Sequence, residues 1–490
     1  MTGRFPPRFW LRVALSVLGL AIVFGVYGRF VAQDLDGTAL NADEGYYAVA
    51  ARSVLEGKMP YRDFGYTQMP LLPYVNGLAM RVVGFGVLEQ RAVNATWAGL
   101  GLLALILALR QRLGRLEPGI VAAFTVAASP NWIAFQTIGK SYGAAGFFLA
   151  CSAAAVLVRG PVLARAGALA VAATLAVGCR LSSGPVVVLL GAALFFEARG
   201  WREKLIAAGL PIGVGVLSLA PFVLAAPENA LFYTWSFHME STMVRRSLAQ
   251  ALEWWKTAPA AILVLATGLF GLPLLVRRRM WTEALFLLAA VAGLALPMVP
   301  TSAYGEYVTP ALPLASSAGM LAFWSTGEAQ GNPFRHVAWI LPALVLFHPL
   351  PESAPGRTSS SMRDVAKYLR EEVPKGPILT PLPMVAVEAG RPVIAGTEMG
   401  MFAAMGPQDR DLARRLKLTT ILDLVRIVEA RQPVAVVKLS GSSVWNFRWQ
   451  VPTLHRQPNG VYARFKQALA KNYELDHRAG NLEILVPREH

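Results

Sequence analysis

Two adjacent carboxylates, Asp43 and Glu44, lie in the stretch NADEGYYAVAARSVLEG, a few residues after the first apolar run of the chain ends. Carboxyl groups can act as general bases or acids, and they can also satisfy backbone donors where a helix begins. Asn41 and Glu44 have the spacing of a capping box, which gives Glu44 a structural explanation. Asp43 gains only about 0.3–1 kcal/mol from the helix dipole. Helical neighbours point about 100° apart, so we expect the two carboxylates to have different roles.

Several basic residues close to the ends of apolar runs are candidates for binding an anion, because charge-assisted hydrogen bonds to phosphate are strong. Each can also be an interfacial side chain that extends to water, or a plain loop charge. These candidates are Arg180 in GCRLSSGPV, Lys140 in TIGKSYG, and the pair Arg245 and Arg246.

Aromatic and polar residues in the same regions are candidates for lining a cleft or an acceptor site. Tyrosines near apolar runs are also expected at a membrane interface whatever the function. His238 and Glu240 are too few to form a metal site, so no metal ligands are predicted. The candidates are Tyr46, Tyr47, Tyr66, His238, Tyr304 and Glu306.

The composition is that of an integral membrane protein. Of the 490 residues, 54% are hydrophobic and only 16% are charged, whereas soluble domains carry about 25% charged residues. The net charge of +16 does not indicate nucleic-acid binding, because the basic residues do not gather on one aromatic-rich segment. Two cysteines near apolar runs, Cys151 and Cys179, exclude a disulfide framework.

Apolar runs long enough to cross a membrane predict about eleven helical spans. The first follows Arg4 and Arg8 and lacks a signal-peptidase site, so we interpret it as a retained anchor. Residues 71–84 are short and broken by prolines, which indicates an interfacial helix. The predicted spans are 9–30, 91–110, 118–136, 142–158, 164–179, 184–197, 205–225, 258–276, 281–299, 307–325 and 337–350.

Basic residues predominate in alternate short loops, which favours a cytoplasmic N-terminus by the positive-inside rule. An odd number of spans then places the C-terminus outside the plasma (inner) membrane. Residues 31–90 form a first outer loop of about sixty residues, and loops of such length are usually functional. Within it, residues 41–55 are expected to form a helix suited to the outer interface.

The hydropathy pattern of the sequence changes near Pro351, beyond which short apolar stretches alternate with amphipathic runs. This pattern predicts a transmembrane domain at 1–350 and a soluble extracytoplasmic α/β domain at 351–490. YELDHRAGNLEILVP has the form of a terminal hairpin that turns at residues 479–481.

ADEGYYAVAARSVLEGKMPYRDFGYTQMPLLPYV, followed by RAVNATWAGLGLLALILALRQRLG, resembles the first outer loop and second span of glycosyltransferase family 39 and its aminoarabinose-transferase relatives. These share the GT-C membrane fold with protein O-mannosyltransferases. The resemblance is best over residues 40–115 and continues more weakly through RLSSGPVVVLLGAALFF and YGEYVTPALPLASSAG.

The resemblance implies a multi-pass α-helical GT-C enzyme that moves a sugar from a polyprenyl-phosphate carrier, with inversion, to a hydroxyl acceptor among lipids, glycans or proteins. Asp43 matches the acidic residue thought to act on the acceptor's proton, with Glu44 beside it as a second catalytic candidate. Arg180, Lys140, Arg245 and Arg246 would bind the donor phosphate. The cofactor is not specified, and a divalent cation stays open.

Two departures from the family pattern accompany this resemblance. Lys140 stands where aminoarabinose transferases tend to carry an acidic residue, and Gln68-Met69-Pro70 replaces a Lys-Pro-Pro. A lipid or sugar transporter and a non-catalytic lipid-binding scaffold are the alternatives. A transporter would require charges near the bilayer centre and broken helices.

Overall fold

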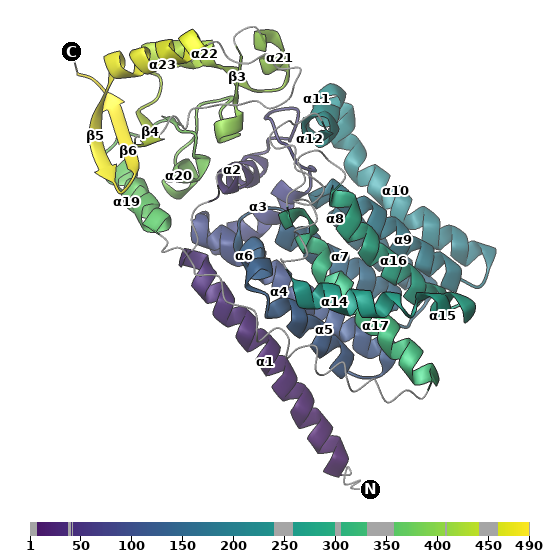
Figure 1. The fold of residues 1–490 in the computed structure, drawn as a ribbon. Helices are drawn as coiled ribbons and strands as arrows, with labels where there is room; N and C mark the ends of the chain where they lie inside the picture. The colour runs from purple at the N-terminus through teal and green to yellow at the C-terminus, as the bar shows by residue number, and fades with distance from the viewer. Residues whose placement is uncertain are drawn as a thin grey trace.

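The computed structural model describes residues 7–37, 41, 43–239, 258–298, 305–330, 357–406, 409–440 and 459–489. Figure 1 shows a bundle of helices with α1 (Pro7–Gly37) running along one side of it. The C-terminal part of the chain covers one end of the bundle, and α2 (Glu44–Leu55) lies between the two.

Every predicted span within the described residues coincides with helix, and the span predicted at 337–350 lies outside them. Apolar side chains face one another in the bundle over a continuous core, as the sequence pattern requires. The helices are α4 (Val87–Leu113), α5 (Glu117–Ala127), α6 (Pro130–Thr137), α7 (Tyr142–Leu157), α8 (Val162–Cys179), α9 (Gly184–Glu197), α10 (Trp201–Ala225), α14 (Pro259–Leu269), α15 (Leu272–Arg277), α16 (Trp281–Ala295) and α17 (Leu312–Gln330).

Five of the described helical segments are long and apolar enough to cross a membrane by themselves. The α5–α6 pair would make a sixth, bent by 78° at its break. Pro130 explains this break, because proline cannot donate the backbone hydrogen bond that would continue the preceding helix. The protein is thus a multi-helix membrane protein, while the total of about eleven spans stays a prediction.

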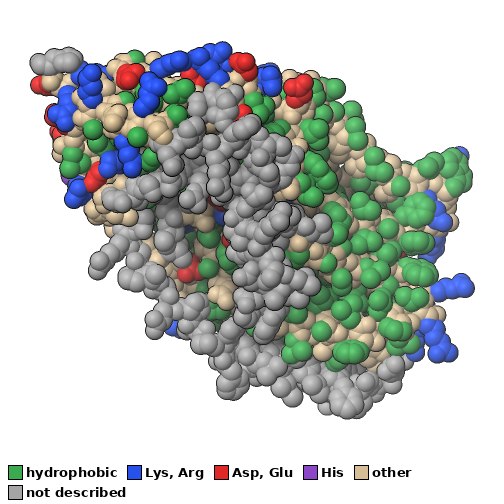
Figure 2. Space-filling view, turned by 45° about the horizontal axis from the view of Figure 1, so that its top comes forward, with side chains coloured by type: hydrophobic (Ala, Val, Ile, Leu, Met, Phe, Trp, Pro, Cys, Tyr) green, Lys and Arg blue, Asp and Glu red, His purple; other side chains and the backbone are tan. Residues whose placement is uncertain are grey.

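The flank of the bundle carries an apolar surface that suits a lipid environment. Side chains of α10 such as Ile212, Leu217 and Leu224 are strongly exposed. Figure 2 shows hydrophobic side chains spread over this flank, while Lys and Arg line the upper edge of the molecule. So large an apolar face would be unfavourable in water and is expected in a bilayer.

The first loop forms two helices, α2 and α3 (Leu72–Val83). Most residues of α2 are buried against other parts of the protein, so protein and not lipid covers this helix. Its expected position at the outer membrane interface stays a prediction. Gly45 explains the close packing: a Cβ there would lie 2.5 Å from the backbone nitrogen of Met384. On α3, a Cβ at Gly77 would lie 2.7 Å from the carbonyl oxygen of Ala51.

The C-terminal part combines a small sheet with helices. The four-stranded sheet has the order β1-β4-β6-β5, with β1 parallel to β4 and the other pairs antiparallel. Strands β2 and β3 form a separate parallel pair. The elements are α19 (Arg357–Glu371), β1 (Ile378–Leu379), α20 (Pro383–Glu388), β2 (Ala404–Met405), α21 (Arg410–Arg415), β3 (Thr419–Thr420), α22 (Ile421–Glu429), β4 (Ala435–Leu439), α23 (Asn459–Asn472), β5 (Tyr473–Ala479) and β6 (Leu482–Pro487).

The predicted terminal hairpin is present, since β5 and β6 pair through a turn in which Gly480 has a φ of 57°. This part of the chain also shares a hydrophobic core with α2, α3 and the start of α4, which includes Ala48, Met80 and Val87. Glu388 accepts a hydrogen bond of 2.9 Å from the backbone N–H of Val87. The C-terminal part therefore packs firmly on the first loop, and the separate domain at 351–490 stays a prediction.

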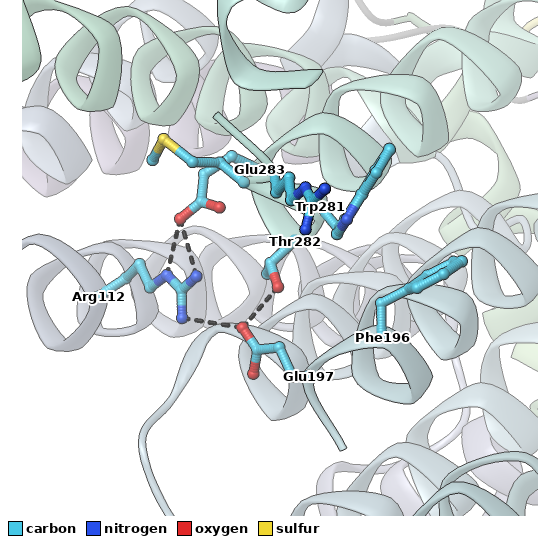
Figure 3. A pocket seen from close by; sticks show the side chains of 8 residues that line it. Arg112, Phe196, Glu197, Trp281, Thr282 and Glu283 are labelled. Atoms are coloured by element: carbon cyan, nitrogen blue, oxygen red, sulfur yellow. Dashed lines mark hydrogen bonds and ion pairs between the residues drawn. The ribbon is translucent and has the colours of Figure 1, made fainter. Parts of the chain in front are cut away.

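A second charged cluster lies at the opposite ends of α4 and α8 from α2. Arg112 donates to Glu283 at 2.8 Å and to Glu197 at 3.0 Å, and Thr282 donates to Glu197 at 2.5 Å. Figure 3 shows these side chains around a hollow of about 220 Å³. Arg165, at the start of α8, donates to the other oxygen of Glu197. We call these five residues the Arg112 cluster.

Candidate functional site

The candidate site lies where α2, α7 and α8 begin or end beneath the C-terminal part. Asp43 directly precedes α2, and Lys140 lies in the short link between α6 and α7. Arg180 directly follows α8, and Glu306 belongs to the 3-10 helix η5 (Gly305–Ala311). These four charged residues, far apart in sequence, were all predicted site residues, and the structure brings them together.

Lys140 bridges two carboxylates. Its Nζ lies 2.9 Å from Oδ2 of Asp43 and 3.0 Å from Oε1 of Glu306. Burial by itself would lower the pKa of Lys140, but the two neighbouring carboxylates outweigh it and raise the pKa above its ordinary value. Burial would likewise raise the pKa of Glu306, but Lys140 and the Tyr142 hydroxyl hold it below its ordinary value. The ammonium and the Glu306 carboxylate are therefore both charged at neutral pH.

Arg180 lies beside this group but has a different environment. Its side chain donates to the hydroxyls of Ser141 at 3.0 Å and Ser182 at 3.2 Å. The guanidinium lies 4.9 Å from the ring centres of both Tyr142 and Tyr307. Arg180 is only 8% exposed, and it has no ion pair with a carboxylate among the residues that the structure describes. Glu306 is near enough for Arg180 to help hold the pKa of that carboxyl below its ordinary value, but no described carboxylate contacts the guanidinium directly. Because a buried cation without a direct anionic contact is costly, this position is suited to an anionic ligand.

Tyr142 links the two parts of the site. Its hydroxyl donates to Oε1 of Glu306 at 2.7 Å, and its ring lies against the Arg180 guanidinium. Tyr142 follows directly after Lys140 and Ser141 in the chain, at the start of α7. One tripeptide therefore contacts Asp43, Glu306 and Arg180.

Glu44 does not face the same space as Asp43. It is fully buried and forms a two-point ion pair with Arg91 of α4, at 2.8 and 2.9 Å. Its Oε1 also accepts from the backbone N–H of Gly139, and its Oε2 accepts from that of Asn41. The bond from the Asn41 N–H is one half of the predicted capping box, but Asp43 and not Asn41 is the N-cap of α2, and it makes no side-chain capping bond. The ion pair with Arg91 was not predicted. Glu44 thus holds the start of α2 and the link that carries Lys140.

The predicted tyrosines pack mainly against one another. The rings of Tyr46 and Tyr47 stack at 4.4 Å, and Tyr66 lies edge-on to both at 6.3 and 6.1 Å. All three are buried, and Phe402 of the C-terminal part lies edge-on to Tyr46. They form the wall beside Asp43, and the hydroxyl of Tyr66 has no hydrogen-bond partner among the described atoms.

His238 contacts the first loop. Its Nε2 lies 2.6 Å from the carbonyl oxygen of Thr67, so Nε2 carries the proton and donates it. Burial lowers the pKa of His238 below its ordinary value, and Arg180 adds to this effect, although the bond to Thr67 opposes it. Tyr304, Arg245 and Arg246 lie outside the described residues.

Sequence reasoning did not identify four residues of the candidate site, which are Gln90, Arg91, Ser141 and Tyr142. Gln90 Nε2 donates to the carbonyl oxygens of Glu44 and Gly139, at 3.2 and 2.7 Å. Arg91 also donates to the carbonyl of Leu35 at the end of α1. One signal was available, because Arg91 opens a predicted span, and a charged residue there is expected to have a partner.

The described residues hold no group of three or more His, Cys, Asp or Glu side chains close enough to bind a metal ion. The donor set around Lys140 includes two carboxylates, and an ammonium already lies between them. The two carboxylates around Lys140 therefore offer no free position for a divalent cation. Whether the protein uses such a cation stays open, as it was from the sequence.

No family model matches the chain, and no curated protein matches it in sequence. Its fold is similar to that of ArnT from Cupriavidus metallidurans bound to undecaprenyl phosphate, with a TM-score of 0.62, 15% identity, and 98% of each chain covered. It is also similar to an oligosaccharyltransferase from Archaeoglobus fulgidus, with a TM-score of 0.55, 12% identity, and 96% of this chain and 80% of that one covered.

The mycobacterial arabinofuranosyltransferase AftD has a TM-score of 0.50 at 15% identity, and the match covers 96% of this chain and 40% of that chain. The second and third of these proteins are named as an oligosaccharyltransferase and an arabinofuranosyltransferase. These likenesses show that the chain has the GT-C membrane fold.

Proposed function

We propose that this membrane protein is an inverting glycosyltransferase that moves a sugar from a polyprenyl-phosphate carrier to a hydroxyl acceptor. In this proposal Asp43 is the general base and Arg180 binds the phosphate of the donor. The site would lie on the outer face of the membrane, since the positive-inside rule assigns the basic loops at the other helix ends to the cytoplasm.

The observation that carries the proposal is the buried Arg180 guanidinium, which contacts two serine hydroxyls and two tyrosine rings. Arginine is the side chain best suited to bind a phosphate through two parallel hydrogen bonds. A partly exposed carboxylate, that of Asp43, lies in the same site. A cation for a leaving phosphate and a carboxylate for an acceptor proton are the two groups that this transfer requires.

The reaction is a single displacement. The acceptor hydroxyl oxygen attacks the anomeric carbon and forms a new C–O bond, while the bond from that carbon to the phosphate oxygen breaks. The bonding electrons leave with the polyprenyl phosphate, and the acceptor's proton moves to the Asp43 carboxylate. The phosphate needs no proton in order to leave, so a second carboxyl acting as an acid is not required. Arg180 stabilises the charge that develops on the phosphate.

The transporter alternative needs charged groups along a path through the helices. The bent pair α5–α6 is the broken helix that such a path could use, but its two helices carry no Lys, Arg, Asp or Glu beyond Glu117 at the start of α5. The charged side chains of the site instead gather at one end of the bundle. A transfer reaction at a membrane face accounts for this distribution better than a transport path does.

The test uses the full-length protein, purified and reconstituted into liposomes with a radiolabelled polyprenyl-phosphate sugar and an acceptor fraction of membrane lipids, glycans and proteins. We expect radiolabel to move into the acceptor fraction with wild-type protein. Asp43→Asn should reduce that movement by about 100- to 10,000-fold while still binding the lipid, and Arg180→Gln should weaken binding of undecaprenyl phosphate. Arg62→Gln is the matched control, because Arg62 is an exposed residue paired with Asp63.

Three results would contradict the proposal. Wild-type transfer that persists in Asp43→Asn would exclude Asp43 as the base. Movement of the lipid between leaflets without transfer would identify a transporter. Lipid binding without either activity would identify a scaffold.

A further inference from the structure

We infer that Lys140 and Glu306 act together as positioning residues for Asp43, and that Lys140 is not a ligand of the donor phosphate. This inference rests on the proposed function, because it assigns roles within the same site. It replaces the sequence-based expectation for Lys140 and gives Glu306 a role other than lining the cleft.

The charge balance carries the first step. The Lys140 ammonium forms ion pairs with both Asp43 and Glu306. The three side chains together carry one negative charge, so their combined field repels an approaching phosphate. Arg180 carries one positive charge that is not balanced by a carboxylate contact within the described part of the chain. A phosphate is therefore attracted to Arg180 and away from Lys140.

The geometry carries the second step. The Asp43 and Glu306 oxygens that contact the buried Nζ of Lys140 are held within about 6 Å of each other. Both carboxylates are only partly exposed, so water screens their charges incompletely. Without the ammonium between them, these two carboxylates would repel each other. Lys140 thus allows the base to stay in place next to a second carboxylate.

The attachment of Glu306 carries the third step. Its Oε1 accepts from Tyr142, whose ring packs against Arg180. Glu306 therefore holds Lys140 at a fixed place relative to the phosphate-binding cation. The ordered contacts run from Asp43 through Lys140, Glu306 and Tyr142 to Arg180. This chain of contacts fixes the separation between the base and the phosphate site.

The experiment compares Lys140→Met, Glu306→Gln, the double variant and Arg180→Gln in reconstituted full-length protein. We expect Lys140→Met to lower kcat by at least about 100-fold with KM for the donor changed by less than about threefold. The double variant should recover at least about tenfold in kcat relative to Lys140→Met, because it removes one of the two repelling carboxylates. Arg180→Gln should raise KM instead.

Matched controls are Lys58→Met and Glu56→Gln, which remove an exposed ion pair of 3.1 Å in the same loop. They should leave kcat and KM at wild-type values. A rise in KM for Lys140→Met with unchanged kcat, and a double variant no better than Lys140→Met, would overturn the inference and make Lys140 a phosphate ligand.

Binding of undecaprenyl phosphate and thermal unfolding separate this inference from the proposed function. If the wild-type protein transfers no sugar, the proposed function is contradicted. The roles of Lys140 and Glu306 in the charge arrangement are then still tested by lipid binding and by Tm. Lys140→Met should then bind undecaprenyl phosphate like the wild type, and the double variant should have a higher Tm than Lys140→Met. Loss of binding in Lys140→Met, or a double variant with an equal or lower Tm, would overturn the inference.

Discussion

Arg91 and Glu44 form a two-point ion pair that is almost completely shielded from water, with N–O distances of 2.8 and 2.9 Å. The pair joins α4 to the start of α2, and the other bonds of Glu44 join it to Gly139 and Asn41. Removing one partner leaves the other buried charge without this two-point ion pair. This relationship separates the two adjacent carboxylates, because Glu44 maintains the structure that presents Asp43.

Replacement of Arg91 by Met should therefore destabilise the protein by about 3–5 kcal/mol, the usual cost of leaving one member of a buried pair. The double variant Arg91→Met/Glu44→Gln should be more stable than Arg91→Met alone, because no buried charge is left. The measurement is thermal unfolding of the detergent-solubilised protein. Arg62→Met is the matched control, and equal Tm values for it and Arg91→Met would contradict the prediction.

Asp43→Asn, in contrast to Arg91→Met, should lower activity but leave stability nearly unchanged. Its side chain contacts Lys140 at the edge of the site and is partly exposed, so we expect little change in Tm. Loss of a general base should reduce sugar transfer by about 100- to 10,000-fold. Transfer rate and Tm measured on the same preparation test both halves of this prediction, and a large fall in Tm would assign Asp43 a structural role.

Arg180→Gln should weaken binding of undecaprenyl phosphate. A hydrogen bond to a charged group contributes about 1.5–3 kcal/mol, which corresponds to a loss in affinity of roughly 10- to 150-fold. Arg180→Lys keeps the charge but cannot form two parallel bonds, so we expect an intermediate affinity. Titration of the lipid into the purified variants gives these values, and unchanged affinity in both would place the phosphate elsewhere.

The stability of the protein should fall as the pH drops below 6.5. His238 has a pKa below its ordinary 6.5 because it is buried, so the unfolded chain binds this proton more readily than the folded one. The contribution of neutral His238 to the free energy of unfolding is thus fully present above pH 6.5. It is lost as the pH falls through the pKa that His238 has in the folded protein. We expect His238→Gln, which can still donate to Thr67, to show a smaller fall in Tm between pH 7.5 and 5.5 than the wild type.

Gly45→Ala should disturb the packing of α2 against the C-terminal part. The added methyl would meet the backbone of Pro383 and Met384, which cannot move as a flexible side chain can. Such overpacking costs about 1–3 kcal/mol. Gly191→Ala in α9 is the control, because no atom lies within 4 Å of the added carbon. Limited proteolysis and Tm should distinguish the two variants, and equal behaviour would show that α2 tolerates displacement.

The sequence predicted the positions of most helices because apolar runs and prolines are local signals. It also selected Asp43, Lys140, Arg180 and Glu306 as candidate site residues, partly through a family resemblance, and the structure brings these four together. It could not predict which of them contact one another. Lys140 and Glu306 are 166 positions apart, and hydropathy carries no information on how two distant helix ends meet.

The burial of α2 was missed for a related reason. Tyrosines beside charges are typical of a membrane interface, and the same residues also suit a helix covered by another part of the chain. Gly45 was the local sign of close contact, but its partner at Met384 lies far along the sequence. Arg91 was likewise interpreted only as the first residue of a predicted span, whereas its guanidinium forms a buried ion pair with Glu44.

Helix α4 carries Arg91 near its beginning and Arg112, the centre of the Arg112 cluster, near its end. At about 1.5 Å per residue these arginines are separated by roughly 32 Å along the helix, close to the roughly 30 Å thickness of the hydrocarbon layer. Both are held by ion pairs. The two ion pairs therefore lie about as far apart as the two faces of a hydrocarbon layer, and the candidate site with Asp43 and Arg180 lies at the Arg91 end of this distance.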